Sequence, residues 1–405
     1  MTAVAVSVLL ARQPIFDNNL QVFGYELLYR GEHPFTLDSV GGDSATSQVV
    51  MNALCGMNPD EVAGTPIFIN LTEAMLVGEQ TPPLPVETTV FEILETTRAS
   101  ELVFKQIRHL KEQGFRIALD DFVWRDDWQE ILPLADFIKI DLFQYDRDQL
   151  RELVAKLKTY PAALIAEKVE TREELEFCRE LGCQYFQGFF LEKPQPVVGK
   201  KLRPQMQLIM DVYASLQRED ITAKELADQI GRDPQLTFQL LRIINSAAFS
   251  LQRRIQNLRE AIMLLGMQKL RTWMMIIALA NERDKPTELL HGLLIRARLA
   301  ELVAQQQMPT KADAAFLLGM FSGLDALLDI PMNELVKRLP LHEEMIQALL
   351  EHQGPLGQLL HQVIAFEHAE WHEFQPGKLA PEIWQQCYYD ALKWARSIAV
   401  PLREK

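Results

Sequence analysis

The sequence predicts two folds in one chain, an α/β TIM-like barrel over residues 1–196 and an all-α domain over residues 197–405. In the first part, short β-rich runs alternate with amphipathic helical runs, which is typical of βα units around a mostly parallel sheet. The stretch Lys193–Pro204 then contains Pro194, Pro196 and a glycine, which interrupt both the strand-like and the helix-like sequence patterns. Beyond it β-rich runs almost disappear and apolar residues recur at helical spacing.

Seven runs of the first part are predicted to be strands. They are Gln21–Tyr29, Pro66–Leu71, Thr89–Ile93, Arg116–Asp120, Phe137–Asp141, Ala163–Glu167 and Tyr185–Phe189. Between them we expect helices over Ser100–Gln113, Asp148–Lys158 and Thr171–Leu181, the first and third opening with a hydroxyl residue suited to an N-cap. Gly114 and Gly182 stand where a left-handed residue commonly ends a helix.

The second part is predicted to consist of helices joined by short connections. The predicted helices are Gln205–Gln217, Thr222–Ile230, Pro234–Asn245, Asn257–Leu264, Gln268–Ala280, Glu288–Gln306 and Ala312–Leu327, with more toward Lys405. Each has apolar residues at helical spacing, which gives one face to bury.

Composition favours a soluble cytoplasmic protein. No run of eighteen apolar residues is present, and Met1–Leu10 is too short and too poor in basic residues for a secretory signal, so we expect no membrane association. The four cysteines show no metal-type spacing, which fits a reducing compartment. A net charge of -14 argues against tight non-specific binding to nucleic acid, and no nucleic-acid partner is expected.

Polar side chains close all the predicted strands of the first part. They are Glu26, Asn70, Glu92, Asp120, Asp121, Lys139, Asp141, Glu167 and Gln187. In a βα barrel the C-terminal ends of the strands meet on one face, where active sites are built. A single carboxylate at a strand end usually faces water or caps the next helix. Because every predicted strand shows the pattern, a shared site is the better interpretation.

The excess of carboxylates at this face predicts a metal site. So many acids with little positive charge would repel each other unless hard cations lay among them. Oxygen ligands suit Mg²⁺, Mn²⁺ or Ca²⁺ rather than zinc. Such a site indicates metal-assisted hydrolysis of a phosphate ester, in which the cation binds the phosphate and lowers the pKa of an attacking water.

The motifs at these strand ends resemble those of the EAL family of cyclic di-GMP phosphodiesterases. The matching segments are Glu26–Arg30 for E-x-L-x-R, Phe68–Leu71 for the asparagine strand, Glu92–Glu95 for E-x-x-E, Asp120–Phe122 for D-D-F, Lys139–Asp141 for K-x-D, Ala166–Thr171 for A-E-G-V-E-T and Gln187–Gly188 for Q-G. All seven occur in the family order over about residues 10–196. The resemblance therefore implies hydrolysis of cyclic di-GMP to the linear dinucleotide.

The resemblance also implies roles for the matching residues. Glu26, Asn70, Glu92 and Asp120 would hold a first Mg²⁺ or Mn²⁺ ion, and Asp121 would bridge to or hold a second. Lys139 and Glu167 would organise or activate the nucleophilic water, with Gln187 supporting that network. Arg30 and Asp141 would contact the substrate, and Glu95 would support the neighbouring loop.

Two departures from the family pattern leave alternatives open. A Gly-Thr-Gly-Tyr-Ser-Ser loop follows D-D-F in the family, whereas Val123–Trp128 follows it here, and glycine allows backbone angles closed to Val and Trp. Lys168 also replaces the glycine of A-E-G-V-E-T. We favour an active phosphodiesterase by a small margin. The alternatives are a catalytically degenerate sensor of cyclic di-GMP and a regulator that only binds proteins.

The second part resembles the HDOD domain, which is related in fold to HD-type phosphohydrolases. The resemblance lies in Asp233–Phe249, Leu258–Gly266 and the Leu270-Arg271 pair. None of the eight histidines is followed by aspartate, so the metal-binding His-Asp doublet is missing. His368 and His372 could share a helix face and bind a metal, but a solvated polar face is favoured. We expect this domain to bind an unknown signalling protein, and a homodimer is compatible with that interpretation.

Overall fold

The computed structural model describes residues 9–30, 64–77, 84–191, 222–231, 234–245, 255, 257–280, 286–337, 339 and 341–403. The chain divides into two compact units. One comprises Met1–Leu191 with Ala365–Phe374, and the other Glu192–Ile364 with Gln375–Lys405.

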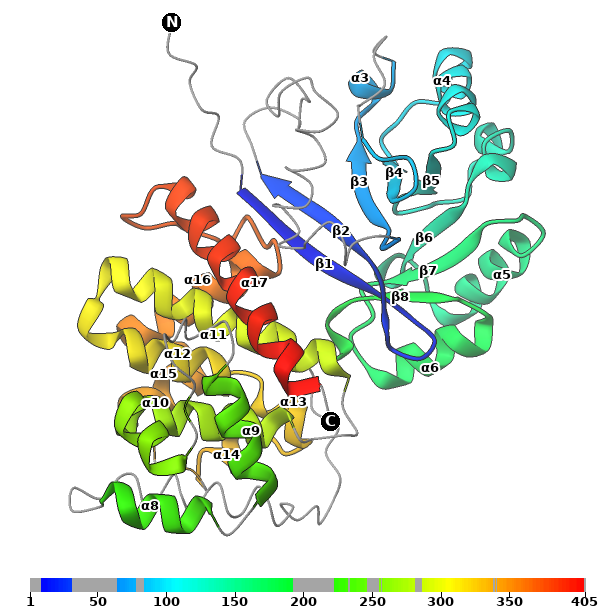
Figure 1. Ribbon diagram of the computed structural model, residues 1–405. Coiled ribbons are helices and arrows are strands. Elements are labelled where there is room, and N and C mark those ends of the chain that lie inside the picture. Colours follow the sequence, from blue (N-terminus) through cyan, green and yellow to red (C-terminus); the bar gives the residue numbers. More distant parts are fainter. Residues whose placement is uncertain are drawn as a thin grey trace, which may run out of the picture. The chain divides into compact units, whose positions relative to one another are not determined.

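Eight strands of the described residues close into a barrel in sequence order (Figure 1). They are β1 (Leu9–Asp17), β2 (Val22–Arg30), β3 (Ile67–Leu71), β4 (Thr89–Ile93), β5 (Arg116–Leu119), β6 (Phe137–Asp141), β7 (Ala163–Glu167) and β8 (Tyr185–Gln187). Neighbours from β2 to β8 pair in parallel, which confirms the predicted α/β barrel and the existence of all seven predicted strands. The strand predicted over Tyr185–Phe189 is too long, because β8 ends at Gln187 and Phe189 begins a short 3-10 helix.

The strand β1 is the part of the barrel that the sequence did not predict. It lies between β2 and β8, runs antiparallel to both, and so completes the closed barrel. Most of its residues are buried, so it lacks the alternation of apolar and polar residues that marks a half-exposed strand. Pro14 within it also argues locally against a strand.

Helices cover the outside of the barrel strands, as Figure 1 shows for α4 (Glu101–Glu112), α5 (Arg147–Leu157) and α6 (Arg172–Leu181). A short helix, α3, spans Glu73–Leu76. The predicted N-caps of α4 and α6 are confirmed, since their hydroxyl oxygens accept backbone N–H groups of the first turn. The α5 helix begins one residue earlier than predicted, because Asp146 caps it. Gly182 ends α6 at φ 95°, the predicted left-handed conformation.

The barrel separates two apolar layers. Inside it lies a small core of Ile15, Phe68, Val90, Ala118, Phe137 and Ile165. A larger core fills the space between strands and helices. Side chains alternate between the two faces of a strand, so the residue two positions after an interior core residue also points inward. This alternation places Asn70, Glu92 and Lys139 directly above the interior core, at the C-terminal ends of their strands.

The second unit is built from helices, and none of its described residues lies in a strand. The helices are α8 (Ala223–Ile230), α9 (Pro234–Ile244), α10 (Leu258–Ala280), α11 (Thr287–Gln307), α12 (Ala312–Phe321), α13 (Leu324–Leu328), α14 (Met332–Leu335), α15 (Glu343–Glu351), α16 (Gly354–Glu367) and α17 (Pro381–Arg403). The central helix is α11, which packs against α12 and α17. A Cβ on Gly319 of α12 would lie 2.7 Å from Ala297 Cα, so glycine permits the close approach of α11 and α12.

Two interruptions of predicted helices lie at glycines. The two helices predicted over Asn257–Leu264 and Gln268–Ala280 are joined in α10, but Gly266 interrupts their helical backbone at φ 71° and ψ 166°. The single helix predicted over Ala312–Leu327 is wrong, because Gly323 separates α12 from α13. The helix predicted over Gln205–Gln217 and the Asp233 cap lie outside the described residues.

The interpretation of His368 and His372 as one solvated helix face is wrong. The helix α16 ends at Glu367, and residues 368–373 form turns rather than a further helical turn. The His368 side chain is 12% exposed, whereas the His372 side chain is 79% exposed. Since helical spacing no longer relates the two rings, they share no common face.

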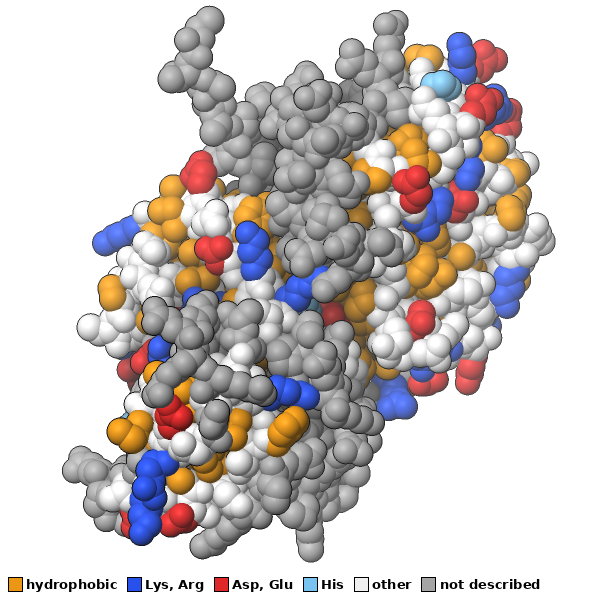
Figure 2. Space-filling model, viewed as in Figure 1, with side chains coloured by type: hydrophobic (Ala, Val, Ile, Leu, Met, Phe, Trp, Pro, Cys, Tyr) orange, Lys and Arg blue, Asp and Glu red, His pale blue; other side chains and the backbone are white. Residues whose placement is uncertain are grey.

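The described surface carries both signs of charge. On the face drawn in Figure 2, Lys and Arg side chains are scattered among Asp and Glu side chains and do not gather into one basic area. Among the described residues, no helix is long and apolar enough to cross a membrane.

We predict that Gly188→Ala destabilises the barrel more than Gly64→Ala. A Cβ on Gly188, whose φ is +144°, would lie 2.2 Å from the carbonyl oxygen of Val169, where β7 meets β8. A Cβ on Gly64, at φ +100°, would meet nothing within 4 Å. The control, Gly64→Ala, should lose about 1–2 kcal/mol of unfolding free energy from backbone strain alone. Gly188→Ala should lose about 2–5 kcal/mol, because the clash adds to the strain. Urea unfolding followed by circular dichroism measures both, and equal losses would contradict the prediction.

Candidate active site

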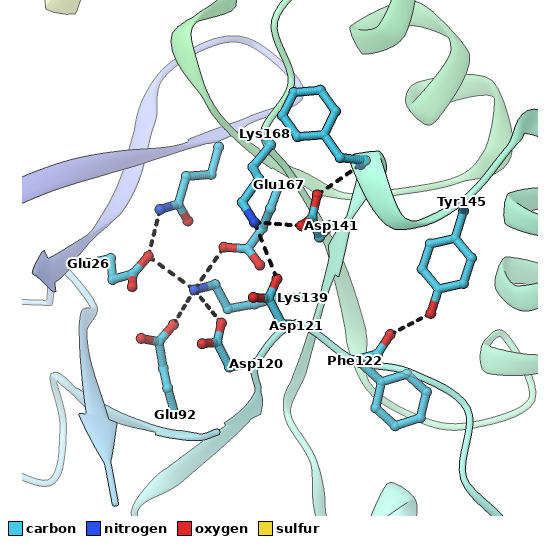
Figure 3. A network of polar contacts seen from close by, with 12 residues as sticks. Glu26, Glu92, Asp120, Asp121, Phe122, Lys139, Asp141, Tyr145, Glu167 and Lys168 are labelled. Atoms are coloured by element: carbon cyan, nitrogen blue, oxygen red, sulfur yellow. Dashed lines mark hydrogen bonds and ion pairs between the residues drawn. The ribbon is translucent and has the colours of Figure 1, made fainter. Parts of the chain in front are cut away.

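The polar residues of the strand ends gather at one end of the barrel in two neighbouring clusters of polar contacts (Figure 3). Strand register brings neighbouring residues level with each other. Asn70 of β3 pairs with Glu92 of β4, and Asp141 of β6 pairs with Glu167 of β7. Because all the strands from β2 to β8 run the same way, their C-terminal residues share this end.

The centre of the network is the ammonium group of Lys139. Its Nζ lies 3.0 Å from Glu26 Oε2, 2.7 Å from Glu92 Oε1, 2.9 Å from Asp120 Oδ1 and 2.9 Å from Glu167 Oε1 (Figure 3). The Lys139 side chain is only 1% exposed, so these four contacts form in a space almost closed to water. One buried cation therefore holds together acids that come from four different strands or strand ends.

Burial shifts the protonation of this network. Burial, and next the charge of Glu26, raise the pKa of Glu92 well above its usual value. Burial likewise raises the pKa of Glu167 to about 8, against the lowering effect of Lys139. Burial alone would lower the pKa of Lys139, but the surrounding carboxylates outweigh it and hold that pKa well above its usual value. The network thus favours the protonated form of Lys139, while burial also favours the protonated form of Glu167.

Two amide side chains hold Glu26 in place. Gln187 Nε2 donates to Glu26 Oε2 at 2.6 Å and to Gln13 Oε1 at 2.8 Å. Asn70 Nδ2 donates to Glu26 Oε1 at the longer distance of 3.5 Å. Gln13 lies on β1, so the antiparallel strand also contributes to the network.

The oxygen atoms of this network fit a hard divalent cation. Within the described residues, no group of three or more His, Cys, Asp or Glu side chains converges as a ready-made metal site, because the acids converge on Lys139. Nevertheless, Asn70 Oδ1 and Glu92 Oε2 are buried without a hydrogen-bond partner. Carboxylate and amide oxygens are the ligands that Mg²⁺ and Mn²⁺ prefer, so the donor set suits those ions.

A second, smaller ionic cluster lies beside the first. Lys168 Nζ lies 2.5 Å from Asp141 Oδ2 and 3.8 Å from Asp121 Oδ1 (Figure 3). The other oxygen of Asp141 accepts the backbone N–H of Phe143 at 2.8 Å. Burial, and next the charge of Asp120, raise the pKa of Asp121. Asp121 and Lys168 both have left-handed backbones, at φ 41° and 56°.

The loop that replaces the glycine-rich segment is fixed by its own contacts. Trp128 is buried, and the guanidinium of Arg125 lies over its ring at 5.3 Å from the centroid. Arg125 also pairs with Asp127 at 2.9 Å. The backbone carbonyl of Phe122, directly before the loop, accepts the hydroxyl of Tyr145 at 2.9 Å.

Two residues predicted for the site do not join the described network. Glu95 is exposed, and its backbone carbonyl accepts a 3.5 Å hydrogen bond from Arg125 of the loop. Arg30 is the last residue of β2, but its side chain lies outside the described part of the structure. The other predicted site residues all lie within the two clusters described above.

Sequence reasoning missed the contributions of Gln13 and Lys168. Gln13 belongs to the strand that was not predicted, and 174 positions separate it from its partner Gln187. Lys168 was noted only as a replacement for glycine. A positive residue next to the strand-end acid Glu167 was the local signal that could have marked it.

We predict that Lys139→Met destabilises the barrel strongly when divalent ions are chelated. The change leaves four carboxylates without their shared cation, which should cost about 3–5 kcal/mol of unfolding free energy. Added Mn²⁺ should restore part of the loss because it supplies positive charge. The control is Arg108→Met, which breaks an exposed pair with Glu130 and should cost less than about 1 kcal/mol. Urea unfolding with and without Mn²⁺ measures this, and a loss no larger than that of the control would refute the role of Lys139.

Known proteins share both parts of this chain. The EAL domain pattern matches residues 48–194, and the HDOD domain pattern matches residues 202–372. The uncharacterized protein YuxH of Bacillus subtilis is 31% identical over 403 residues, covering 96% of this chain and 98% of its own. The cyclic di-GMP phosphodiesterase CdgJ of Vibrio cholerae is 32% identical over 400 residues, which cover 96% of this chain and 92% of CdgJ.

Among solved structures, an EAL domain protein of Listeria monocytogenes matches with a TM-score of 0.35 and 24% identity. The match covers 45% of this chain and 87% of that protein. The two relatives align with both parts of the chain together, and each is more than 30% identical to it. The chain therefore belongs to the family of proteins in which an EAL domain is followed by an HDOD domain.

Proposed function

We propose that the barrel is a metal-dependent phosphodiesterase that opens one phosphodiester bond of cyclic di-GMP and releases the linear dinucleotide. The observation that carries this proposal is the set of four acids gathered around the buried Lys139 at the C-terminal end of the barrel strands. Membership of the EAL family and the similarity to CdgJ, a cyclic di-GMP phosphodiesterase, support the choice of substrate.

The residues of the first cluster would bind the metal through oxygen. Glu26, Asn70, Glu92 and Asp120 would hold one Mg²⁺ or Mn²⁺ ion, and the unpartnered oxygens of Asn70 and Glu92 support this assignment. When bound, the ion supplies positive charge to the phosphate and lowers the pKa of the attacking water. Gln187 fixes the orientation of Glu26 and would keep it aligned for binding.

Glu167 and Lys139 would handle the proton and the charge of the reaction. Burial raises the pKa of Glu167 to about 8, so its carboxylate form is a stronger base than that of an exposed glutamate and would accept a proton from water. Lys139 stays protonated and lies 2.9 Å from Glu167 Oε1, so it stabilises the carboxylate form that accepts the proton. Asp141 of the second cluster would contact the nucleotide. Arg30, at the end of β2, would contact it as well.

A binding protein without turnover is the second candidate. The observation that favours it is the loop Val123–Trp128, whose buried Trp128 and Arg125–Asp127 pair replace a flexible glycine-rich segment. In that case the barrel would sense cyclic di-GMP, and the helical domain would report its presence to a protein partner. Binding of cyclic di-GMP with Ca²⁺, together with no hydrolysis in Mg²⁺ or Mn²⁺, would select this alternative.

We predict that Glu167→Gln lowers the turnover number for cyclic di-GMP by about 10²-fold or more, because it removes the group that accepts the proton. Mn²⁺ affinity should change little, since Glu167 is not assigned as a metal ligand. The matched control is Glu173→Gln, an exposed residue that pairs with Arg147 and should keep full activity. The turnover number is measured by following the loss of cyclic di-GMP chromatographically. Full activity of the Glu167→Gln variant would show that Glu167 does not act in catalysis.

We also propose that the HDOD domain is an interaction domain that binds a signalling protein and takes no catalytic metal. The test measures the Mn²⁺ content of the full-length protein that carries Glu92→Gln. Since Glu92 is assigned to the barrel ion, this variant should retain less than a tenth of the Mn²⁺ that the wild type retains after desalting. Glu112→Gln, with a side chain 78% exposed, is the control and should retain the wild-type content. Stoichiometric metal in Glu92→Gln would point to a further site elsewhere in the chain.

A further inference from the structure

The backbone conformation of Lys168 sets the direction in which its side chain leaves the main chain. Lys168 follows β7 directly and has φ 56°, a left-handed conformation that side chains other than glycine adopt rarely. The next residue, Val169, donates its backbone N–H to the carbonyl of Gln187 at 3.0 Å, which ties the turn to β8. The tight approach of Gly188 to Val169 leaves this turn little freedom. The barrel closure therefore holds the turn, and the turn directs the lysine toward Asp141.

The two ionic clusters differ in their balance of charge. In the first cluster one ammonium group faces four carboxylates, and buried oxygens of Asn70 and Glu92 remain without hydrogen bonds. In the second cluster the ammonium of Lys168 pairs with Asp141 and, at the longer distance of 3.8 Å, with Asp121, and Asp141 also accepts a backbone N–H. The first cluster thus has four acids for one cation, and its unpartnered oxygens are donors that a divalent ion can take up. The second cluster has two acids for one cation, so its excess of acids is smaller.

We infer that Lys168 acts as a covalently attached cation between Asp121 and Asp141, and that it limits the barrel to one divalent ion. This inference rests on the proposed function, because it concerns the ions of the same site. A divalent ion at the second cluster would have to displace an ammonium group that already lies 2.5 Å from Asp141 Oδ2. Like charges in that space repel each other, so the lysine decides the number of ions.

The test counts the Mn²⁺ ions bound by the full-length protein. Isothermal titration with MnCl₂ and electron paramagnetic resonance of free Mn²⁺ give the number of sites without any measurement of activity. Wild type should bind one ion per chain. Lys168→Gly should bind two, because Asp121 and Asp141 lose their cation and become free to bind a second. Circular dichroism checks that each variant is folded.

Two further substitutions separate charge from backbone effects. Lys168→Asn removes the charge but keeps a side chain that tolerates the left-handed conformation, so it should also bind two ions. Lys168→Arg keeps the positive charge and should bind one ion, as the wild type does. A count of two in Lys168→Arg would overturn the inference, since charge would then not decide the number.

The outcomes also distinguish this inference from the proposed function. Equal Mn²⁺ counts in wild type, Lys168→Gly and Lys168→Asn, whether none, one or two, would overturn the inference. If cyclic di-GMP is still hydrolysed in that case, the proposed function stands and only the role of Lys168 falls. If no ion binds to any of the proteins and no hydrolysis occurs, the metal-dependent phosphodiesterase falls as well.

Discussion

The barrel depends on one buried ionic interaction, between the ammonium group of Lys139 and four carboxylates. Burying any of these groups alone would cost several kcal/mol, so the acids and the lysine stabilise the fold only together. Lys139 is 1% exposed and within 3.0 Å of all four acids, which leaves little tolerance for a shift of any strand. The register of the parallel strands is therefore a requirement of the site as much as of the sheet.

The interior core supports this interaction from below. Phe68, Phe137 and Ile165 lie two residues before Asn70, Lys139 and Glu167 on their strands, so packing fixes the direction of the polar side chains. Such packing keeps the carboxylates close together although they repel each other. A site of this kind is preorganised, since the same contacts that close the barrel also position its reactive groups.

Two lysines, Lys139 and Lys168, each pair with acids at the acidic end of the barrel, and the two clusters differ in how many acids surround the ammonium group. Around Lys139 four acids face one cation, which is where the proposed divalent ion would bind and supply its chemistry. Around Lys168 two acids face one cation, and burial, which would lower the pKa of Lys168, is outweighed by these carboxylates, which raise it. The lysine that replaces the family glycine therefore changes the electrostatics of the site without removing any of its acids.

Sequence by itself determined the barrel, the helical domain and most of the residues at the barrel rim. These features depend on local periodicity, which places an inward polar residue two positions after an inward apolar one, as in Phe137-Ile138-Lys139. Glycine positions likewise indicated Gly182 as a helix end, although Gly323 was overlooked as a break.

Tertiary structure alone decided how strand β1, Gln13 and Lys168 enter the site. The strand β1 is recognised by its antiparallel pairing with β2 and β8, and Gln13 meets Gln187 across 174 positions of sequence. Lys168 reaches Asp141 because closure of the barrel holds its backbone in a left-handed turn. Local patterns carry no information about such partners, because the contacts exist only once distant segments have been brought together.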